Sequence, residues 1–155
     1  MVPKFADDFS VGAKFSIGEY RISASDIIDF ATKFDPQPYH TSASAAEKSV
    51  FRGLVASGWH SAAIWMRLYV DHMLTDAAVE GSPGVDELRW RAPVRPDDVL
   101  TGSVEVIELK HSAFRRDIVT VFKKGALHRP GDAGPVLSLI LQSRYRTRPI
   151  PSTEL

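Results

Sequence analysis

The chain has 155 residues, contains no cysteine, and balances 19 basic against 19 acidic side chains. The absence of cysteine excludes disulfides, thiolate metal ligands and cysteine nucleophiles, and it fits a reducing compartment. A net charge of zero excludes bulk attraction to nucleic acid or anionic membranes and favours self-association. This length predicts a single domain over residues 1–155 that needs no staple to fold.

Two features bear on localisation. Asp7 and Asp8 lie where a signal peptide would need an apolar core, so no export signal is expected. Residues 58–74 form the most apolar window, but charged and histidine side chains interrupt it too often for a membrane span. We therefore expect a cytoplasmic protein that binds neither membrane nor nucleic acid.

The N-terminal part predicts a strand followed by a helix. Residues 15–22 have the pattern of an edge strand. Ser23 or Ser25 can cap the following helix, whose apolar residues recur at three-to-four spacing. The helix cannot continue through Pro36, so we expect Asp35 just beyond its C-terminus.

Prolines stiffen the next segment. Pro36 and Pro38 predict a rigid, non-helical stretch, after which Thr41 or Ser42 starts a short turn of helix that reaches Glu47. Such a segment can hold the side chains on either side of it in one orientation.

A long apolar helix is predicted from Ser57, its N-cap, to Leu74. One mostly polar stripe is expected along it, formed by His60, Ile64, Arg67 and Asp71, with the last two as an i,i+4 pair. The other sides are apolar, so a sheet or a subunit interface must cover them.

The C-terminal half has the period-two pattern of antiparallel strands. Strands are expected near residues 87–91, 99–109, 118–122 and 136–147. The alternation slips at Val106, which predicts a bulge. Lys123 to Gly125 are expected to end the third of these strands, residues 127–135 to form an exposed loop, and residues 148–155 to form a flexible tail. Together these elements predict an α+β protein of hot-dog-like fold, an antiparallel sheet wrapped around one long apolar central helix.

Candidate chemistry is confined to one region. Asp35 and His40 are five residues apart in the proline-stiffened segment, and a carboxylate beside an imidazole can orient and deprotonate water. The alternative is that Asp35 accepts turn amides and His40 is a polar turn residue, which spacing alone slightly favours. Gly58 would place a free amide at the first helical turn, where an oxyanion could bind, although every helix has such an end. The histidines of the long helix, His60 and His72, lack the spacing of metal ligands, so no metal is expected.

Three segments resemble the MaoC-like dehydratases, which include (R)-specific enoyl-CoA hydratases. Residues 35–40, DPQPYH, are similar to the family's Asp-x-Asn-Pro-aliphatic-His loop, with Gln37 and Tyr39 as departures. Residues 53–58 resemble the segment that leads into the family's central helix. Residues 90–98 resemble its aromatic-x-x-Pro-Val-x-x-Gly-Asp turn. These segments follow the family's order, and the resemblance covers nearly the whole chain.

The resemblance implies a hot-dog fold, a homodimer or higher homo-oligomer, and reversible hydration of trans-2-enoyl thioesters of coenzyme A. It implies no metal or redox cofactor, coenzyme A being part of the acyl-CoA substrate. By position, Asp35 and His40 would activate the water that adds at C3 and return a proton at C2. Gly58 would donate its amide to the thioester oxygen.

Departures from the family leave alternatives open. Some hydratases have a serine about two helical turns beyond the glycine, and Met66 lies near that place here. Together with Gln37, this is compatible with an altered substrate or with a non-catalytic module that binds acyl-CoA or oligomerises. A hot-dog thioesterase is a third alternative. The expected substrate-binding residues are Gln37, Tyr39, Ser57, Trp59 and Met66.

Bulky side chains predict a short acyl pocket. Large residues lie along the central helix and next to His40, namely Trp59, Trp65, Met66, Tyr69 and Tyr39. If they line the acyl tunnel, they fill space that a long chain would occupy. Short or polar enoyl groups are therefore the expected substrates.

Overall fold

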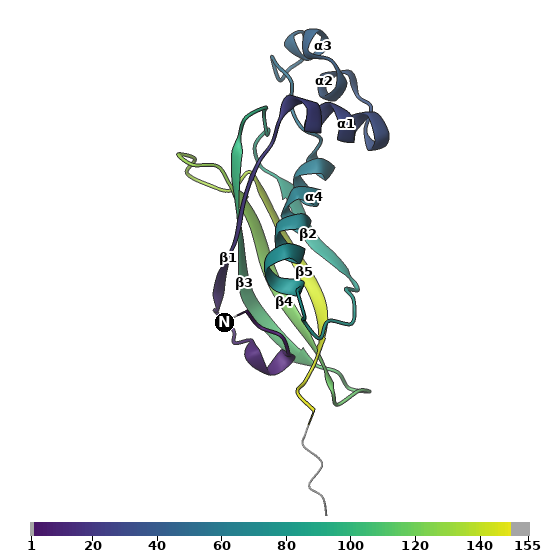
Figure 1. Ribbon diagram of the computed structural model, residues 1–155, viewed down its shortest axis with the longest axis vertical. Helices are drawn as coiled ribbons and strands as arrows, with labels where there is room; N and C mark the ends of the chain where they lie inside the picture. The colour runs from purple at the N-terminus through teal and green to yellow at the C-terminus, as the bar shows by residue number, and fades with distance from the viewer. Residues whose placement is uncertain (1, 150–155) are drawn as a thin grey trace, which may run out of the picture.

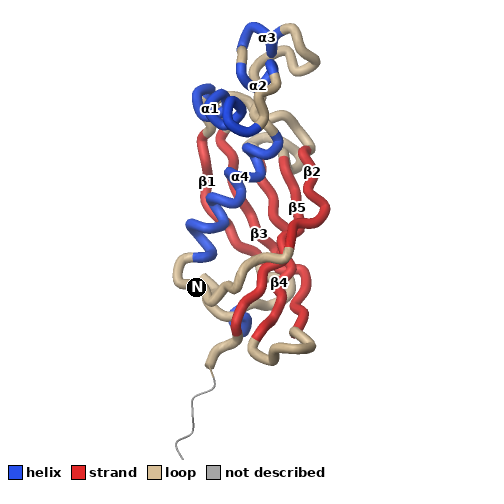
Figure 2. The backbone as a smooth tube through the Cα atoms, turned by 90° about the vertical axis from the view of Figure 1, so that its right-hand side faces the viewer, coloured by secondary structure: helices blue, strands red, loops and turns tan. Residues whose placement is uncertain are grey.

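The computed structural model describes residues 2–149. Within these residues, five strands form one antiparallel sheet in the order β1-β3-β4-β5-β2, and α4 lies along one of its faces (Figures 1 and 2). The elements are η1 (Ala6–Asp8), β1 (Lys14–Arg21), α1 (Ala24–Phe34), α2 (Pro38–Thr41), α3 (Ala43–Glu47), α4 (Gly58–Tyr69), η2 (Val70–Leu74), β2 (Gly84–Trp90), β3 (Val99–His111), β4 (Ile118–His128) and β5 (Leu137–Arg146). The three short helices α1 to α3 cluster at one end of the sheet, next to the N-terminus of α4.

The start and end of α1 agree with the sequence prediction. The Ser23 side chain accepts from Asp26 N–H while the Asp26 carboxylate accepts from Ser23 N–H, which forms a capping box. Asp35 is the C-cap. The predicted non-helical stretch is wrong at Pro38, because α2 begins there. Proline suits the first helical position, where its N–H would have no partner and its fixed φ is already helical.

The central helix α4 begins as predicted, with Ser57 as its N-cap. The predicted polar stripe is wrong, because His60 and Ile64 are buried while Arg67 and Asp71 form an exposed ion pair at 2.7 Å. His60 stacks on Phe30 of α1, with ring centroids 4.5 Å apart, so α1 covers this end of the helix. The exposed face of the helix instead carries apolar side chains, Trp59, Ala63 and Met66, and continues to Val70.

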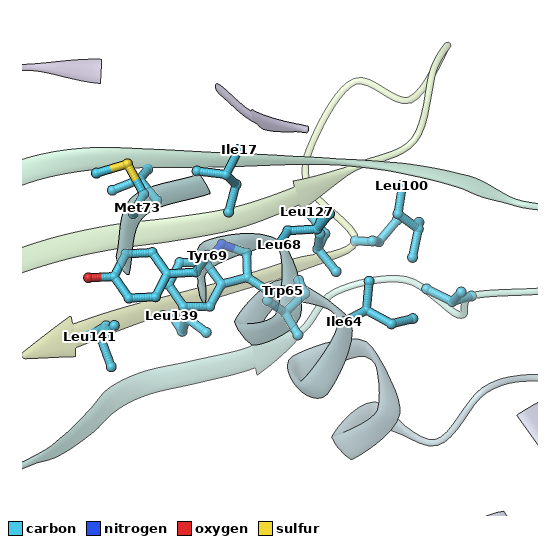
Figure 3. Close-up of a cluster of buried hydrophobic side chains, with 14 of the residues drawn as sticks. Ile17, Ile64, Trp65, Leu68, Tyr69, Met73, Leu100, Leu127, Leu139 and Leu141 are labelled. Atoms are coloured by element: carbon cyan, nitrogen blue, oxygen red, sulfur yellow. The ribbon is translucent and has the colours of Figure 1, made fainter. Parts of the chain in front are cut away.

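The core lies between α4 and the inner face of the sheet (Figure 3). Trp65 and Tyr69 are completely buried there, and their rings stack 5.1 Å apart. The Trp65 indole fills the place of a side chain at Gly125 of β4, where a Cβ atom would lie 2.3 Å from the ring. Glycine at this position therefore allows the central helix to pack closely on the sheet.

One prediction about the long strands is confirmed and another is wrong. The register of β3 against β4 shifts between Val106 and Glu108, which confirms the bulge. The predicted end of the next strand is wrong, since β4 continues through Lys123 and Gly125 to His128. Lys123 is completely buried and faces aromatic rings, so here a lysine belongs to the interior and does not mark a turn.

The last described residues return to the N-terminal segment. The Arg148 amide donates to Asp7 over 2.7 Å, and the Arg148 guanidinium donates to Asp8. The first residue of the predicted flexible tail is thus held in place, and residues 150–155 lie outside the described residues. Within residues 2–149, no helix has both the length and the apolar character needed to cross a membrane.

Candidate active site

The ends of α1 and α4 meet α2 at one cavity of about 470 Å³. In chain order, its lining residues are Asp35, Gln37, Tyr39, His40, Phe51, Val55, Ala56, Gly58, Trp59, Ser61, Trp90, Arg91, Ala92, Pro93 and Val94. The cavity therefore combines the carboxylate, the imidazole and the helix N-terminus that the sequence indicated.

Asp35 presents an ionised carboxylate. Ser57 Oγ donates to Asp35 Oδ2, and Gln37 Nε2 donates to Asp35 Oδ1, each over 2.7 Å. The bond from Ser57, then that from Gln37, and the nearby imidazole hold the pKa of Asp35 below its usual value, against the opposing effect of burial. The carboxylate can therefore act as a hydrogen-bond acceptor at neutral pH.

His40 is buried and fixed in orientation. Its Nδ1 lies 2.7 Å from the carbonyl oxygen of Val55. A carbonyl oxygen only accepts, so Nδ1 carries a proton and Nε2 of the neutral ring is left with a lone pair. His40 Nε2 lies 3.5 Å from Asp35 Oδ2. A water molecule that contacts both atoms would meet two acceptors, which is the arrangement needed to polarise it.

Gln37 and Tyr39 form a hydrogen-bonded extension of Asp35. The Tyr39 hydroxyl donates to Gln37 Oε1, and the other end of the same carboxamide donates to Asp35. The Tyr39 ring also packs edge-on against His40, with centroids 4.5 Å apart. Gln37 thus contacts Asp35, and Tyr39 contacts His40.

Gly58 is the first residue of α4, so its amide has no intrahelical acceptor. No side chain or backbone group within residues 2–149 accepts a hydrogen bond from it. The Trp90 indole lies against Gly58, where an added Cβ atom would be 2.5 Å from the ring. Only glycine fits here, and its amide borders the cavity and can donate to a bound oxygen.

Of the remaining predicted site residues, one lines the cavity and the others lie outside it. Trp59 lines the cavity and packs edge-on against Trp90. Ser57 is completely buried and contacts Asp35 instead of the cavity. Met66 is exposed and lies outside the cavity, while Trp65, named for the acyl tunnel, belongs to the core, as does Tyr69. Within the described chain, no three His, Asp or Glu side chains gather in a way that could hold a metal ion.

Several residues that line the cavity were not predicted from the sequence. Trp90 lines the cavity. It is the aromatic residue of the segment 90–98 that resembles the family's turn, and this match could have identified it as a lining residue. Phe51 lies in an irregular connector and lines the cavity. Its ring centroid is 5.2 Å from that of Tyr39. Nothing in the local sequence distinguishes Phe51 or Ser61 as lining residues.

Comparisons with known proteins agree on one family. The MaoC-like domain matches residues 8–127. The uncharacterised protein YdeM of Bacillus subtilis is 31% identical over 115 residues, which cover 74% of this chain and 82% of YdeM. The crystal structure of a MaoC-like dehydratase from Rhodospirillum rubrum is 36% identical, covers 94% of this chain and 99% of its own, and has a TM-score of 0.87.

A more distant structure shows the same fold. The unliganded (R)-hydratase PhaJ1 of Pseudomonas aeruginosa is 18% identical, with a TM-score of 0.73 over 99% of this chain and 97% of its own. The antiparallel sheet and central helix are therefore those of a hot-dog fold. With the domain match and two relatives above 30% identity, the chain belongs to the MaoC-like dehydratase family.

Proposed function

We propose that this protein is a hydro-lyase that reversibly hydrates trans-2-enoyl-CoA to 3-hydroxyacyl-CoA. The observation that carries the proposal is that Asp35, His40 and the Gly58 amide border one cavity. Membership of a dehydratase family supports it, as does the fold shared with an (R)-hydratase.

The acid/base pair would supply the water. A water held by Asp35 Oδ2 and His40 Nε2 would attack C3 of the enoyl group while one of its protons passes to the pair. The same proton then returns to C2, so H and OH add across the double bond and the pair ends as it began. Dehydration follows the same steps in reverse.

The helix terminus would stabilise the intermediate. Attack at C3 moves negative charge through C2 onto the thioester oxygen, and a fixed amide stabilises that charge best in a site without bulk water. Gly58 N–H offers such a donor at the positive end of α4. The activation of water and the stabilisation of the negative charge are thus assigned to different groups of the cavity.

The alternatives use the same site differently. A thioesterase would direct the activated water to the thioester carbon and release free coenzyme A. A non-catalytic module would bind acyl-CoA without converting it. The departures at Gln37 and Met66 made this module an alternative in the sequence analysis. The hydrogen bond from Gln37 to Asp35 favours the enzyme, because it orients the carboxylate.

A single assay separates these three functions. The purified protein is mixed with crotonyl-, hexenoyl- and decenoyl-CoA, and the loss of conjugated-thioester absorbance is followed together with the release of thiol. Hydration removes the absorbance without releasing thiol, whereas a thioesterase releases thiol and a binding module does neither. Loss of the absorbance with no thiol is the expected result.

We also propose that short enoyl groups are preferred. Four aromatic side chains, Tyr39, Phe51, Trp59 and Trp90, line the cavity, and each occupies space that a long acyl chain would need. Phe51→Leu is expected to raise kcat/KM for hexenoyl-CoA relative to crotonyl-CoA. Phe114→Leu, at a 98% exposed residue outside the cavity, is the control. A wild-type kcat/KM that rises with chain length would contradict this preference.

A second copy of the chain is the proposed partner. The exposed side of α4 carries Trp59, Met66 and, just beyond it, Val70. Strand β2 lies at the edge of the sheet, and its Val85 and Trp90 are also exposed. An uncovered apolar helix face beside an unpaired strand edge is suited to a two-fold interface that extends the sheet.

A further inference from the structure

We propose that Ser57 and Gln37 are positioning residues that hold Asp35 in fixed register with the N-terminus of α4, an inference that rests on the proposed hydration. Ser57 Oγ donates to Asp35 Oδ2 over 2.7 Å and accepts from Trp59 N–H over 3.3 Å. One hydroxyl therefore joins the carboxylate to the helix that carries the Gly58 amide. The water-holding group and the oxyanion donor cannot move apart without breaking it.

Gln37 forms the second tether. Its carboxamide oxygen accepts from the Tyr39 hydroxyl, so its NH₂ end faces Asp35 Oδ1. A phenol hydroxyl and a carboxylate on opposite sides fix which way the carboxamide points. Asp35 is thus held at one oxygen from α4 and at the other from the segment that precedes α2. With both oxygens bound, the carboxylate cannot rotate away from His40.

Existing hydrogen bonds and burial separate this role from substrate binding, since Gln37 borders the cavity with both ends of its carboxamide already bound, while Ser57 is buried. Ser57 has no exposed surface and is not among the residues that line the cavity. The NH₂ group of Gln37 is bound to Asp35, and its oxygen is bound to Tyr39. Removing either tether should therefore lower kcat and leave substrate affinity nearly unchanged. A misplaced acid/base group slows the reaction step but does not weaken the contacts that bind the substrate.

The tethers also leave a signature that does not depend on activity. The hydrogen bonds from Ser57 and Gln37 are the two largest causes that lower the pKa of Asp35. Loss of either donor removes a bond to the charged form, so the titration midpoint of the carboxyl group should move to higher pH. A residue that only stabilised the fold would not move it.

The test uses Ser57→Ala, Ser57→Thr and Gln37→Leu, with Ser42→Ala as the matched control. Ser42 caps α3 by accepting from Ala45 N–H, its hydroxyl also pairs with that of Ser44, and it makes no hydrogen bond to Asp35, so its variant loses only bonds at the start of α3. For each protein, kcat and KM are measured on the best enoyl-CoA, and Asp35 is titrated by carboxyl-carbon NMR. Gln37 is exposed, so its variant tests the second tether even if Ser57→Ala does not fold.

Ser57→Ala and Gln37→Leu are expected to lower kcat by about 10- to 100-fold with KM changed less than about two-fold, and to raise the Asp35 midpoint. Ser57→Thr, which keeps the hydroxyl, should restore both values. Unchanged kcat, or a higher KM with an unmoved Asp35 midpoint, would overturn the tether. If the wild type hydrates no thioester, the proposed function fails, and the Asp35 titration alone then decides for or against the tether.

Discussion

Lys123 places an amine in the interior of the fold without a hydrogen-bond partner. Its side chain is completely buried, and no partner for Nζ is found within the described residues. Nζ faces the rings of Phe9, Tyr69 and Tyr145, at 5.2, 5.6 and 4.6 Å from their centroids. The rings attract a cation weakly, but no carboxylate compensates for burial, which lowers the pKa of Lys123 to about 7.

This lysine predicts that stability increases with pH above neutrality. Between about pH 7 and 9.5 the unfolded chain binds the lysine proton and the folded chain does not, so the free energy of unfolding rises with pH by up to about 1.4 kcal/mol per unit. The facing hydroxyls of Tyr69 and Tyr145 bond to each other, and burial raises both pKa values. These tyrosines therefore reverse the trend only where unfolded tyrosine ionises, above about pH 10.

Urea unfolding of Lys123→Met at several pH values checks this prediction. Methionine removes the unpaired amine at similar volume, so the variant is expected to be about 1–3 kcal/mol more stable than the wild type at pH 7 and to lose the lysine's part of the pH slope. Lys124→Met, at the exposed neighbour, should keep the slope. An identical slope in wild type and Lys123→Met would show that the lysine is charged in the folded protein.

At the residue scale, the sequence was sufficient to place Asp35, His40 and Gly58 at one cavity. Asp35, His40 and Gly58 follow local signals, namely a helix stop, a proline-stiffened segment and a helix start. The hydrogen bond from Ser57 to Asp35 joins residues 22 apart and depends on how α1 packs near α4. Met66 lies on the predicted helix, but which side of that helix faces the cavity is decided by the sheet.

At the element scale, the prediction failed where packing overrode local propensity. Two lysines and a glycine usually end a strand, yet β4 continues because Lys123 enters an aromatic cluster and Gly125 makes room for Trp65. The start of α2 at Pro38 was missed because prolines suggest irregular structure, although proline also suits a first helical turn. The succession of helices and strands along the chain, the bulge and the N-cap of α4 followed from local pattern more directly.

The turn between β2 and β3 contains a strained residue. The φ of Asp97 is 68°, in the left-handed region that favours glycine. Asp97→Gly is expected to raise the free energy of unfolding by up to about 1 kcal/mol, because glycine adopts this φ without a Cβ clash. Asp97→Ala should lower it, since alanine keeps the clash and tolerates this region less well than aspartate. Thermal unfolding of both variants measures the difference, and a less stable glycine variant would contradict the strain.

At the scale of the whole molecule, the exposed apolar face of α4 predicts a homodimer. Sedimentation equilibrium at micromolar concentration should give twice the chain mass of 17.1 kDa. Val70→Glu places a charge on this face and is expected to yield monomers, because an unpaired carboxylate would be buried in the interface. Val50→Glu introduces the same charge at a 91% exposed residue away from this face and should remain dimeric. A stable wild-type monomer would exclude the proposed interface.

The catalytic assignment is tested most directly by the turnover of enoyl-CoA in variants of the acid/base pair. Asp35→Asn and His40→Ala are each expected to reduce the hydration rate by about two to four orders of magnitude, because each removes a group that holds and deprotonates the water. Asp29→Asn, at an exposed aspartate of α1 outside the cavity, should retain the wild-type rate. All three should keep the wild-type circular dichroism spectrum. Near wild-type hydration by both Asp35→Asn and His40→Ala would contradict the assignment of this cavity as the active site.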